Sequence, residues 1–322
     1  MSNQYVYAVA RIRSKELSLL NDQAIGQLLA AKDYGECLRM LADRGWGNGE
    51  SDISAETMLA DEREKTWALI GELVDDLSPF DVFLYANDYH NLKAAIKLVY
   101  TGEQDFGVFI SHGTLPPQEI RRMVENQAFS ELPEGMRAPA EEAYTALSQT
   151  GDGQLCDIIL DRAALEAVVR AGQESKIPLF ALYAELTAAS ANIKTSVRCL
   201  KTGKSVDFIR RALAPCSTLD VSLLAKAASE SMDAICDYLA QTDYASAVSA
   251  LRQSPSAFER WCDNLMIQRI KPQQFEPFGI GPLAAYILGR ENEIKSVRII
   301  LLGKLNGLPE ESIRERVREM YV

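Results

Sequence analysis

The sequence predicts an all-α protein built from three similar helical units. Apolar residues recur at helical spacings of three and four along most of the 322-residue chain. Nowhere do several runs of β-branched residues alternate with period two, as strands would require. A longer motif also returns at intervals of roughly one hundred residues, which indicates repeated units. We therefore expect about ten to fifteen helices that pack on one another rather than on a sheet.

The longest predicted helix spans 281–307. Its apolar positions are Leu283, Tyr286, Ile287, Ile294, Val297, Leu301 and Leu305. The residues predicted to occupy its opposite face are Arg290, Glu291, Lys295 and Arg298. Pro282 is tolerated in a first helical turn, and Gly307 supplies a stop. A short charged helix is expected over 310–320, with acidic residues first and arginines later, as the helix dipole favours.

The amino-terminal third is predicted to form helices separated by polar breaks. In order, these helices cover 5–20, 23–31, 34–42, a longer segment from Ser54 or Thr57 to Leu77, and 80–100. Asn21 and Asp33 are placed to cap the second and third. Prolines and glycines between Gly102 and Pro117 predict a loop, with room for one short strand over 106–110. From Pro117 onward, short helices follow one another to the long carboxy-terminal helix.

A motif that combines a tyrosine, a basic helical stretch and a glycine stop occurs three times. The basic stretches are Asn91–Lys97, Asn192–Arg198 and, in a looser copy, Glu293–Arg298. We interpret them as the long helices of three related units, which could stand around a common axis. The predicted domains are 1–110, 111–205 and 206–322, with the terminal helices 1–20 and 310–320 packing together.

Charge and composition exclude several classes of function. The net charge of −11 disfavours nucleic-acid binding and direct docking on an anionic membrane, both of which need basic surface. The start of the chain has no signal-peptide pattern, and no apolar run reaches the ~18 residues of a membrane span. The six cysteines are far apart without a CxxC motif, so we expect reduced thiols in a soluble cytoplasmic protein. Most of the acidic excess lies in 48–81 and is predicted to be a solvated face, with a basic partner as the alternative.

No motif predicts catalysis, a cofactor or a metal. The run Lys201-Thr202-Gly203-Lys204-Ser205 ends like a phosphate-binding loop, but it closes a helix and has Arg198 where the first glycine belongs. The Asp105-Phe106-Gly107 triplet lacks the other kinase motifs. His90 and His112 have no further ligand at metal-binding spacing. We therefore expect a protein without nucleotide, cofactor or metal sites.

Two long segments carry a family resemblance. The run Phe275–Val317 and the opening pattern, Tyr5–Arg13 with Leu28–Gly47, resemble the C subunit of V-type and A-type rotary ATPases, the counterpart of the eukaryotic d subunit. Asp161-Arg162 and Leu182-Tyr183 fit the middle of that family's pattern. The resemblance spans nearly the whole chain and is weakest between residues 103 and 150.

The resemblance implies a non-catalytic central-stalk (rotor) subunit. Members of this family are funnels of three similar helical domains with approximate threefold symmetry. They sit on the cytoplasmic face of the membrane proteolipid ring without entering the membrane, and they receive the central axle subunits of D and F type. In that position they transmit torque for ATP-coupled H⁺ or Na⁺ transport. The sequence of this chain does not indicate which of the two ions the ring carries.

The candidate interface consists of cations on the three long helices. These are Lys93, Lys97, Lys194, Arg198, Lys295 and Arg298. Our hypothesis is that they face the axle cavity or the ring, and the alternative is that they line ordinary solvated helix faces. A helical-repeat scaffold that binds protein partners is the competing interpretation, but its repeats would be ~34–47 residues long. An all-helical enzyme is disfavoured by the scarcity of histidine and of activated nucleophiles.

Overall fold

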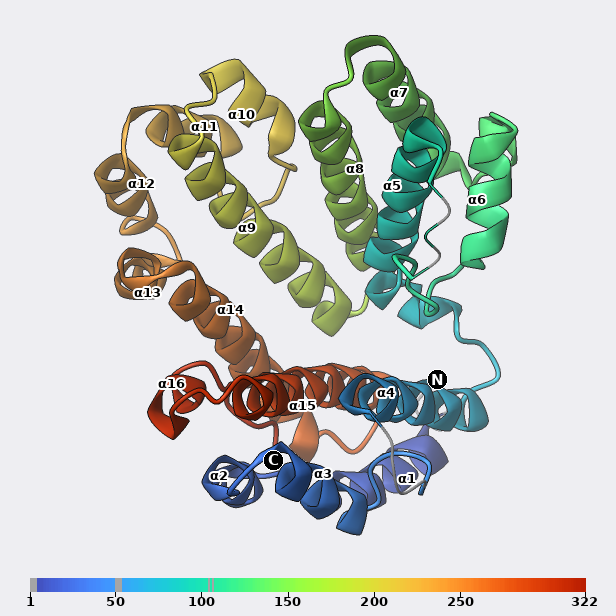
Figure 1. Ribbon diagram of the computed structural model, residues 1–322, viewed down its shortest axis with the longest axis vertical. Coiled ribbons are helices and arrows are strands. Elements are labelled where there is room, and N and C mark those ends of the chain that lie inside the picture. The colour runs from blue at the N-terminus through green and yellow to red at the C-terminus, as the bar shows by residue number, and fades with distance from the viewer. Residues whose placement is uncertain (1–4, 50–53, 104, 106) are drawn as a thin grey trace. The chain divides into compact units, whose positions relative to one another are not determined.

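A computed structural model of the chain describes residues 5–49, 54–103, 105 and 107–322 (Figure 1). Within these residues the regular structure is entirely helical, with sixteen α-helices and four 3₁₀ helices, so the predicted all-α class is confirmed. The chain divides into two compact units. Unit 1 comprises Met1–Leu77 with Ser249–Val322, and unit 2 comprises Ser78–Val248.

Unit 1 is organised around the long helix α15. Its helices are α1 (Val6–Glu16), α2 (Asp22–Ala30), α3 (Tyr34–Asp43), α4 (Ala55–Leu73), α14 (Pro255–Ile270), the 3₁₀ helix η4 (Lys271–Phe275), α15 (Gly281–Leu305) and α16 (Glu310–Arg314), while α13 (Val248–Gln253) lies at the division between the units. Helix α15 packs against α1, α3, α4 and α14. The core includes Leu28, Leu41 and Met58 from the first three helices after α1, together with Val297 and Leu301 of α15.

The predicted apolar face of α15 is confirmed at all but one position. Leu283, Tyr286, Ile287, Ile294, Val297 and Leu301 are buried, whereas Leu305 near the helix end is 60% exposed. Arg290, which was predicted on the face opposite the apolar positions, is also buried, with an exposed fraction of only 6%. Helices surround α15 on more than one side, so a residue between the apolar positions is also enclosed.

Several predicted helix starts are confirmed by side-chain caps. Asn21, Asp33 and Ser54 accept hydrogen bonds from backbone N–H groups in the first turns of α2, α3 and α4. The predicted end of α4 at Leu77 is wrong, since the helix stops at Leu73. Asp75 and Asp76 follow the C-cap residue Val74, and acidic residues are unfavourable at a helix carboxyl end.

The final helix is shorter than predicted, since α16 ends at Arg314 instead of 320. Beyond it, Val317, Met320 and Tyr321 are buried in unit 1, and tertiary packing of these side chains overrides the local helix preference. The Tyr321 hydroxyl donates a hydrogen bond of 3.3 Å to Oε1 of Glu16 at the end of α1. The first and last segments of the chain therefore meet within unit 1.

Unit 2 contains two groups of helices. The elements are η1 (Ser78–Phe83), α5 (Tyr85–Thr101), α6 (Pro117–Glu125), η2 (Phe129–Glu131), α7 (Glu134–Thr150), α8 (Gly153–Glu174), α9 (Pro178–Lys201), α10 (Val206–Ala212), α11 (Val221–Glu230), α12 (Met232–Leu239) and η3 (Ala245–Ala247). Helices α5 to α8 lie side by side and share one core (Figure 1). Helix α9 packs on α8 and also contacts α10, α11 and α12.

The segment between 78 and 110 differs from the prediction in two ways. The expected single helix over 80–100 is divided into η1 and α5. The structure has no strand over 107–110, where a turn is followed by irregular structure, and Phe106 lies outside the described residues. Aromatic rings hold η1 against the start of α9, with the Phe83 ring edge-on to Phe180 at 5.4 Å and to Tyr183 at 4.7 Å.

Helices α8 and α9 approach closely at Gly172. A Cβ atom added there would lie 2.6 Å from the Cβ atom of Ala184 and 2.8 Å from the carbonyl oxygen of Phe180. Only glycine permits this contact between the two backbones, so Gly172 determines how closely α8 and α9 approach each other. The division of the chain into three domains at 110 and 205 stays a prediction.

Candidate partner interface

The six predicted cations lie on the three helices that the sequence singled out. Lys93 and Lys97 belong to α5, Lys194 and Arg198 to α9, and Lys295 and Arg298 to α15. Within each pair the two residues are three or four positions apart, so both share one face of their helix. The α5 and α9 pairs belong to unit 2 and the α15 pair to unit 1.

On α5, both cations are used inside unit 2. Lys93 Nζ lies 2.6 Å from a carboxylate oxygen of Asp161, and Lys97 Nζ lies 2.6 Å from one of Asp157. Both acids project from α8, which packs along α5. These ion pairs join two helices of the same bundle, so the α5 cations have a structural role.

On α15, both cations are likewise engaged. Lys295 Nζ lies 2.8 Å from Asp263 of α14, and Arg298 lies 3.0 Å from Glu56 of α4. Asp263 also accepts a hydrogen bond of 2.8 Å from Arg318 in the carboxy-terminal segment. The α15 cations thus link three parts of unit 1.

On α9 the situation differs. Lys194 and Arg198 are exposed, and no ion pair involves either of them among the residues that the structure describes. Of the six predicted residues, only these two present their charge without an acidic neighbour from the described part of their own chain. The hypothesis of a partner interface is therefore best supported on α9.

Sequence reasoning missed a set of polar residues that begin the repeated motif. Asn91 exchanges two hydrogen bonds with the backbone of Ile110, at 2.8 and 2.9 Å, and Asn192 does the same with Ala214, at 2.9 and 2.7 Å. In the third copy, Glu293 accepts a hydrogen bond from the backbone N–H of Leu20. We call each of these contacts a polar clasp.

The clasps share a structural context. Asn91, Asn192 and Glu293 are buried on a long helix, and each binds a segment that leads into a new helix: α6, α11 or α2. A buried backbone group without a partner is costly, so each clasp stabilises the path of the chain. The signal was present in the sequence, because these residues are the first of each repeated basic stretch.

Two carboxylates, the buried Asp88 and the half-buried Glu185, accept hydrogen bonds from the loops near the clasps. Asp88 accepts hydrogen bonds from Thr114 and Leu115, and burial raises its pKa in spite of these bonds. For Glu185, burial also raises the pKa, but hydrogen bonds from Thr218 and Ser217 outweigh it and leave the pKa below its ordinary value. Folding therefore raises the proton affinity of Asp88 and lowers that of Glu185, each compared with the unfolded chain.

A buried ionic cluster lies beside α15 in unit 1. The Arg290 guanidinium contacts the carboxylates of Glu62 on α4 and of Glu293, and it lies 5.2 Å from the centre of the Trp46 ring. Glu62 also accepts a hydrogen bond from the backbone N–H of Gly47 at 3.0 Å. Burial raises the pKa of Glu293 against the attraction of Arg290. The cluster connects α4, α15 and the loop after α3.

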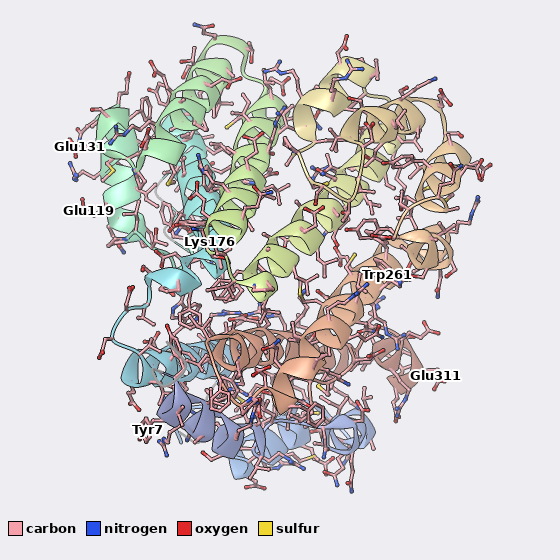
Figure 2. All side chains as sticks on the ribbon, turned by 180° about the vertical axis from the view of Figure 1, so that it is seen from behind. Tyr7, Glu119, Glu131, Lys176, Trp261 and Glu311 are labelled. Carbon is pink, nitrogen blue, oxygen red and sulfur yellow. The ribbon has the colours of Figure 1, made fainter. Side chains whose placement is uncertain are left out.

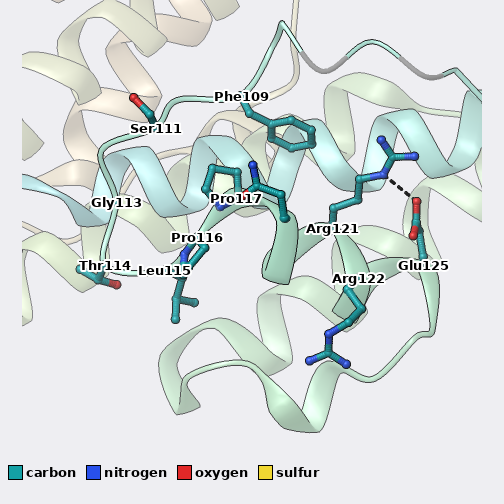
Figure 3. A pocket seen from close by; sticks show the side chains of 11 residues that line it. Phe109, Ser111, Gly113, Thr114, Leu115, Pro116, Pro117, Arg121, Arg122 and Glu125 are labelled. Carbon is teal, nitrogen blue, oxygen red and sulfur yellow. Dashed lines mark hydrogen bonds and ion pairs between the residues drawn. The ribbon is translucent and has the colours of Figure 1, made fainter. Parts of the chain in front are cut away.

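A hollow of about 590 Å³ in unit 2 is the alternative place for a small ligand. Its lining includes Phe109, Gln118, Arg121, Arg122 and Glu125 (Figure 3). Arg121 pairs with Glu125 at 2.6 Å. Arg122 pairs with Glu119 and Glu131, at 3.0 and 2.8 Å, and Figure 2 labels these two acids on neighbouring segments. The cations of the hollow are engaged by acids of their own chain, so they give little support for an anion site.

The run that ends like a phosphate loop is a helix end, as predicted. Helix α9 stops at Lys201, and Gly203 has a φ of 62° in the left-handed region. The N–H of Lys204 donates to the carbonyl of Cys199 at 3.0 Å, which closes the helix in the manner of a glycine cap.

Within the described residues, no helix combines the length and apolarity that crossing a bilayer requires.

Fold and contacts together define an all-helical protein in which long helices and polar clasps recur. The chain belongs to the family of ATP synthase (C/AC39) subunits, whose model matches residues 8–316. The match covers the two terminal segments that carried the resemblance in the sequence, apart from residues 5–7 and Val317, and the weaker region between them.

Individual relatives match over almost their whole length. The V-type sodium ATPase C subunit of Enterococcus hirae is 24% identical, over 96% of this chain and 97% of that protein. The A-type ATP synthase C subunit of Methanocaldococcus jannaschii is 24% identical, over 96% of this chain and 85% of that protein. The V-type ATP synthase C subunit of Thermus thermophilus is 24% identical, over 98% of this chain and 99% of that protein.

Proposed function

We propose that the protein is a non-catalytic central-stalk subunit of a V/A-type rotary ATPase or ATP synthase. It links the central axle to the membrane proteolipid ring and transmits torque for ATP-coupled transport of H⁺ or Na⁺. The main support is the family match over residues 8–316, together with relatives named as C subunits of these complexes that align with 96–98% of this chain.

The internal contacts are consistent with a mechanical role. A torque-transmitting body must resist bending, and densely packed helices have low compressibility. The ion pairs of Lys93 and Lys97 tie α5 to α8, and those of Lys295 and Arg298 tie α15 to α14 and α4. Such cross-links between neighbouring helices oppose sliding of one helix along another.

The polar clasps support a three-lobed architecture with approximate threefold symmetry. The clasped backbone residues are Leu20, Ile110 and Ala214, each bound by the long helix of one motif copy. In this proposal the amino-terminal segment completes the third lobe, whose long helix comes near the end of the chain. The predicted domain 206–322 would then also include the amino-terminal segment, which the prediction had assigned to the domain 1–110. The remaining predicted domain is 111–205.

The proposed partners are the axle subunits of D and F type and the proteolipid ring, at the cytoplasmic face of the membrane. Docking on the ring would place the protein at the membrane without inserting into it. The proposal requires no nucleotide, cofactor or metal site on this chain, because the catalytic head and the ring perform those steps.

Co-purification from the native membrane tests the proposal. A tagged full-length chain should bring down axle and proteolipid subunits with about one copy of the chain per complex. The isolated protein should show no ATP hydrolysis and no nucleotide binding by calorimetry. Isolation of the intact rotary complex without this chain, or ATP turnover by the chain alone, would contradict the proposed function.

A further inference from the structure

Two segments of unit 1 carry a large share of the exposed apolar side chains. The segments are 6–18, which contains α1, and 269–280, which runs from the end of α14 to the start of α15. Of the thirteen large hydrophobic side chains that are exposed in the described residues, five belong to these segments: Val6, Tyr7, Leu17, Phe275 and Phe278. Leu17 and Phe275 are the two most exposed of the thirteen, at 89% and 85%. Such a concentration marks a place where a partner or a membrane binds.

Hydrogen bonds join the two segments into one surface. Arg13 Nη2 donates to the carbonyl oxygens of Gln273 and Glu276, at 2.6 and 2.7 Å. Tyr321 makes a second connection, because its hydroxyl donates to Glu16 of α1 while its carbonyl oxygen accepts a hydrogen bond from η4. The loop before α15 is therefore held against α1 at two places, and its exposed phenyl rings have a defined position beside that helix.

The exposed side of α1 combines apolar and basic residues. These residues form two rows at helical spacing, Val6, Arg13 and Leu17 beside the bound loop and Tyr7, Arg11 and Lys15 next to them. Figure 2 labels Tyr7 near the start of α1. The one acid of this helix, Glu16, is buried and pairs with Arg13 at 2.8 Å. The exposed side of α1, a helix that is described throughout, therefore carries only positive charge.

The local charge is opposite in sign to that of the whole chain. Segments 6–18 and 269–280 contain five cations and two acids: Arg11, Arg13, Lys15, Arg269 and Lys271, with Glu16 and Glu276. The net charge of −11 opposes attraction of the whole molecule to an anionic surface. At physiological ionic strength, however, exposed charges more than about 8 Å away are largely screened. The nearby cations therefore govern a contact made by these segments, and they complement negative charge.

The form of the surface favours a lipid headgroup layer over a folded protein. Phe275 ends η4 with 85% of its side chain exposed, so its ring protrudes from the loop instead of lying in a flat apolar patch. A protein partner would need a fitted pocket for such a ring. The boundary between headgroups and acyl chains accepts it without one, and cations beside it meet the acidic headgroups.

We propose that segments 6–18 and 269–280 form a contact surface for anionic lipid, in which Leu17, Phe275 and Phe278 enter the headgroup boundary. The neighbouring cations then bind the acidic headgroups. The contact is shallow, because single side chains rather than a helix enter the membrane. This inference goes beyond the proposed function, which brings the protein to the membrane through protein partners alone.

Binding of the purified full-length chain to lipid vesicles tests the proposal. The wild type should sediment with vesicles of phosphatidylserine and phosphatidylcholine in equal amounts, and bind pure phosphatidylcholine at least about tenfold more weakly. The F275A/F278A variant should bind the mixed vesicles at least about tenfold more weakly than the wild type, since two apolar side chains no longer leave water. This loss should persist at high ionic strength.

Neutralising the cations of α1 should have a different signature. The R11Q/K15Q variant should bind the mixed vesicles at least about fivefold more weakly at low ionic strength, because two cations near the acidic headgroups are removed. Its affinity should also depend less on salt than that of the wild type. Sedimentation at low and high ionic strength measures both effects.

Matched controls alter the same kinds of side chain elsewhere. Y100A/L223A removes two exposed apolar side chains of unit 2, and K176Q/K226Q removes two exposed positive charges. Both controls should bind the mixed vesicles like the wild type. Circular dichroism and thermal unfolding establish that all four double variants are folded.

A reporter at the protruding ring tests the contact directly. In F275W the new indole should be quenched by brominated lipid in the mixed vesicles, beyond the quenching of the wild type. The matched control L223W places an indole at an exposed site on α11 and should show no added quenching.

Each outcome bears on a separate claim. If the wild type does not bind the mixed vesicles, or if F275A/F278A binds them equally well, the lipid contact is wrong while the proposed function stands. If F275A/F278A keeps vesicle binding but no longer co-purifies with the rotary complex, the surface contacts a protein and the inference is overturned. The proposed function fails separately, when the wild-type chain does not co-purify with the complex, whatever the vesicles show.

Discussion

Asp88 and Glu185 show how two carboxylates in similar positions acquire opposite acid–base behaviour. Both receive hydrogen bonds from a threonine hydroxyl and from backbone N–H groups of a later segment, which precedes α6 for Asp88 and α11 for Glu185. For Asp88 the loss of hydration on burial prevails, whereas for Glu185 the hydrogen bonds prevail. The balance depends on how deeply each side chain is enclosed, since Asp88 is 1% exposed and Glu185 only half-buried.

The raised pKa of Asp88 predicts a stability change with pH. The folded protein takes up a proton at this site before the unfolded chain does, so its contribution to stability is present below the ordinary pKa of 3.8 and is lost as pH rises through the folded pKa. The free energy of unfolding of the wild type, relative to D88N, should therefore rise as pH falls toward 4. The slope cannot exceed about 1.4 kcal/mol per pH unit for one proton.

The lowered pKa of Glu185 predicts the reverse. Its contribution is present above the ordinary pKa of 4.5 and is lost as pH falls through the folded pKa, so the wild type should lose stability relative to E185Q in that acidic range. Urea unfolding of the wild type, D88N and E185Q from neutral to acidic pH measures both differences. Parallel pH profiles for the two variants would show that the two environments are not opposed as described.

At the scale of helices, the sequence was informative where local signals are strong. The long helix α15 was predicted over 281–307 and is observed at Gly281–Leu305, because proline, apolar spacing and glycine all indicate the same limits. The caps Asn21 and Asp33 were recognisable for the same reason. The end of α16 was not predictable, since Val317 and Tyr321 leave the helix to fill a core built by distant segments.

The close contact between α8 and α9 predicts the effect of an added methyl group. The substitution G172A should destabilise unit 2 by about 1–3 kcal/mol, although alanine has the higher helix propensity, because the new Cβ atom overlaps Ala184 and the Phe180 carbonyl. The matched control is G26A in α2, where an added Cβ atom meets nothing within 4 Å. It should stabilise unit 1 by about 0.5–1 kcal/mol through helix propensity alone.

Thermal and urea unfolding of the two glycine variants provide the comparison. Because the substitutions are chemically identical and both lie within helices, the opposite signs isolate the helix–helix contact from backbone effects. Equal shifts in the two variants would mean that α8 and α9 are farther apart than the structure places them.

At the scale of the whole molecule, the sequence predicted the class of fold and the helices that bear the candidate interface. It could not separate the six cations, because the acids that neutralise them lie far away in the chain. Lys93 and its partner Asp161 are 68 residues apart, and no local pattern connects them. The buried position of Arg290 was missed for the same reason, since Glu62 is 228 residues away.

The division into units predicts how fragments of the chain behave. Unit 2 is one continuous stretch with its own core, so a fragment of residues 78–248 should be helical and unfold cooperatively. A fragment of residues 1–77 should not fold alone, because its apolar faces are covered by α15. Circular dichroism and heat-induced unfolding test both, and a molten 78–248 fragment would contradict the prediction.

The discontinuity of unit 1 has a consequence for biosynthesis. The ribosome releases α1 to α4 first, yet the side chains that cover Leu28 and Leu41 are among the last to be translated. While unit 2 is synthesised and folds, the apolar faces of those early helices remain accessible to chaperones and proteases. Premature termination before α15 would leave the apolar faces of α2 to α4 uncovered, so such truncated products should be degraded faster than the full-length chain.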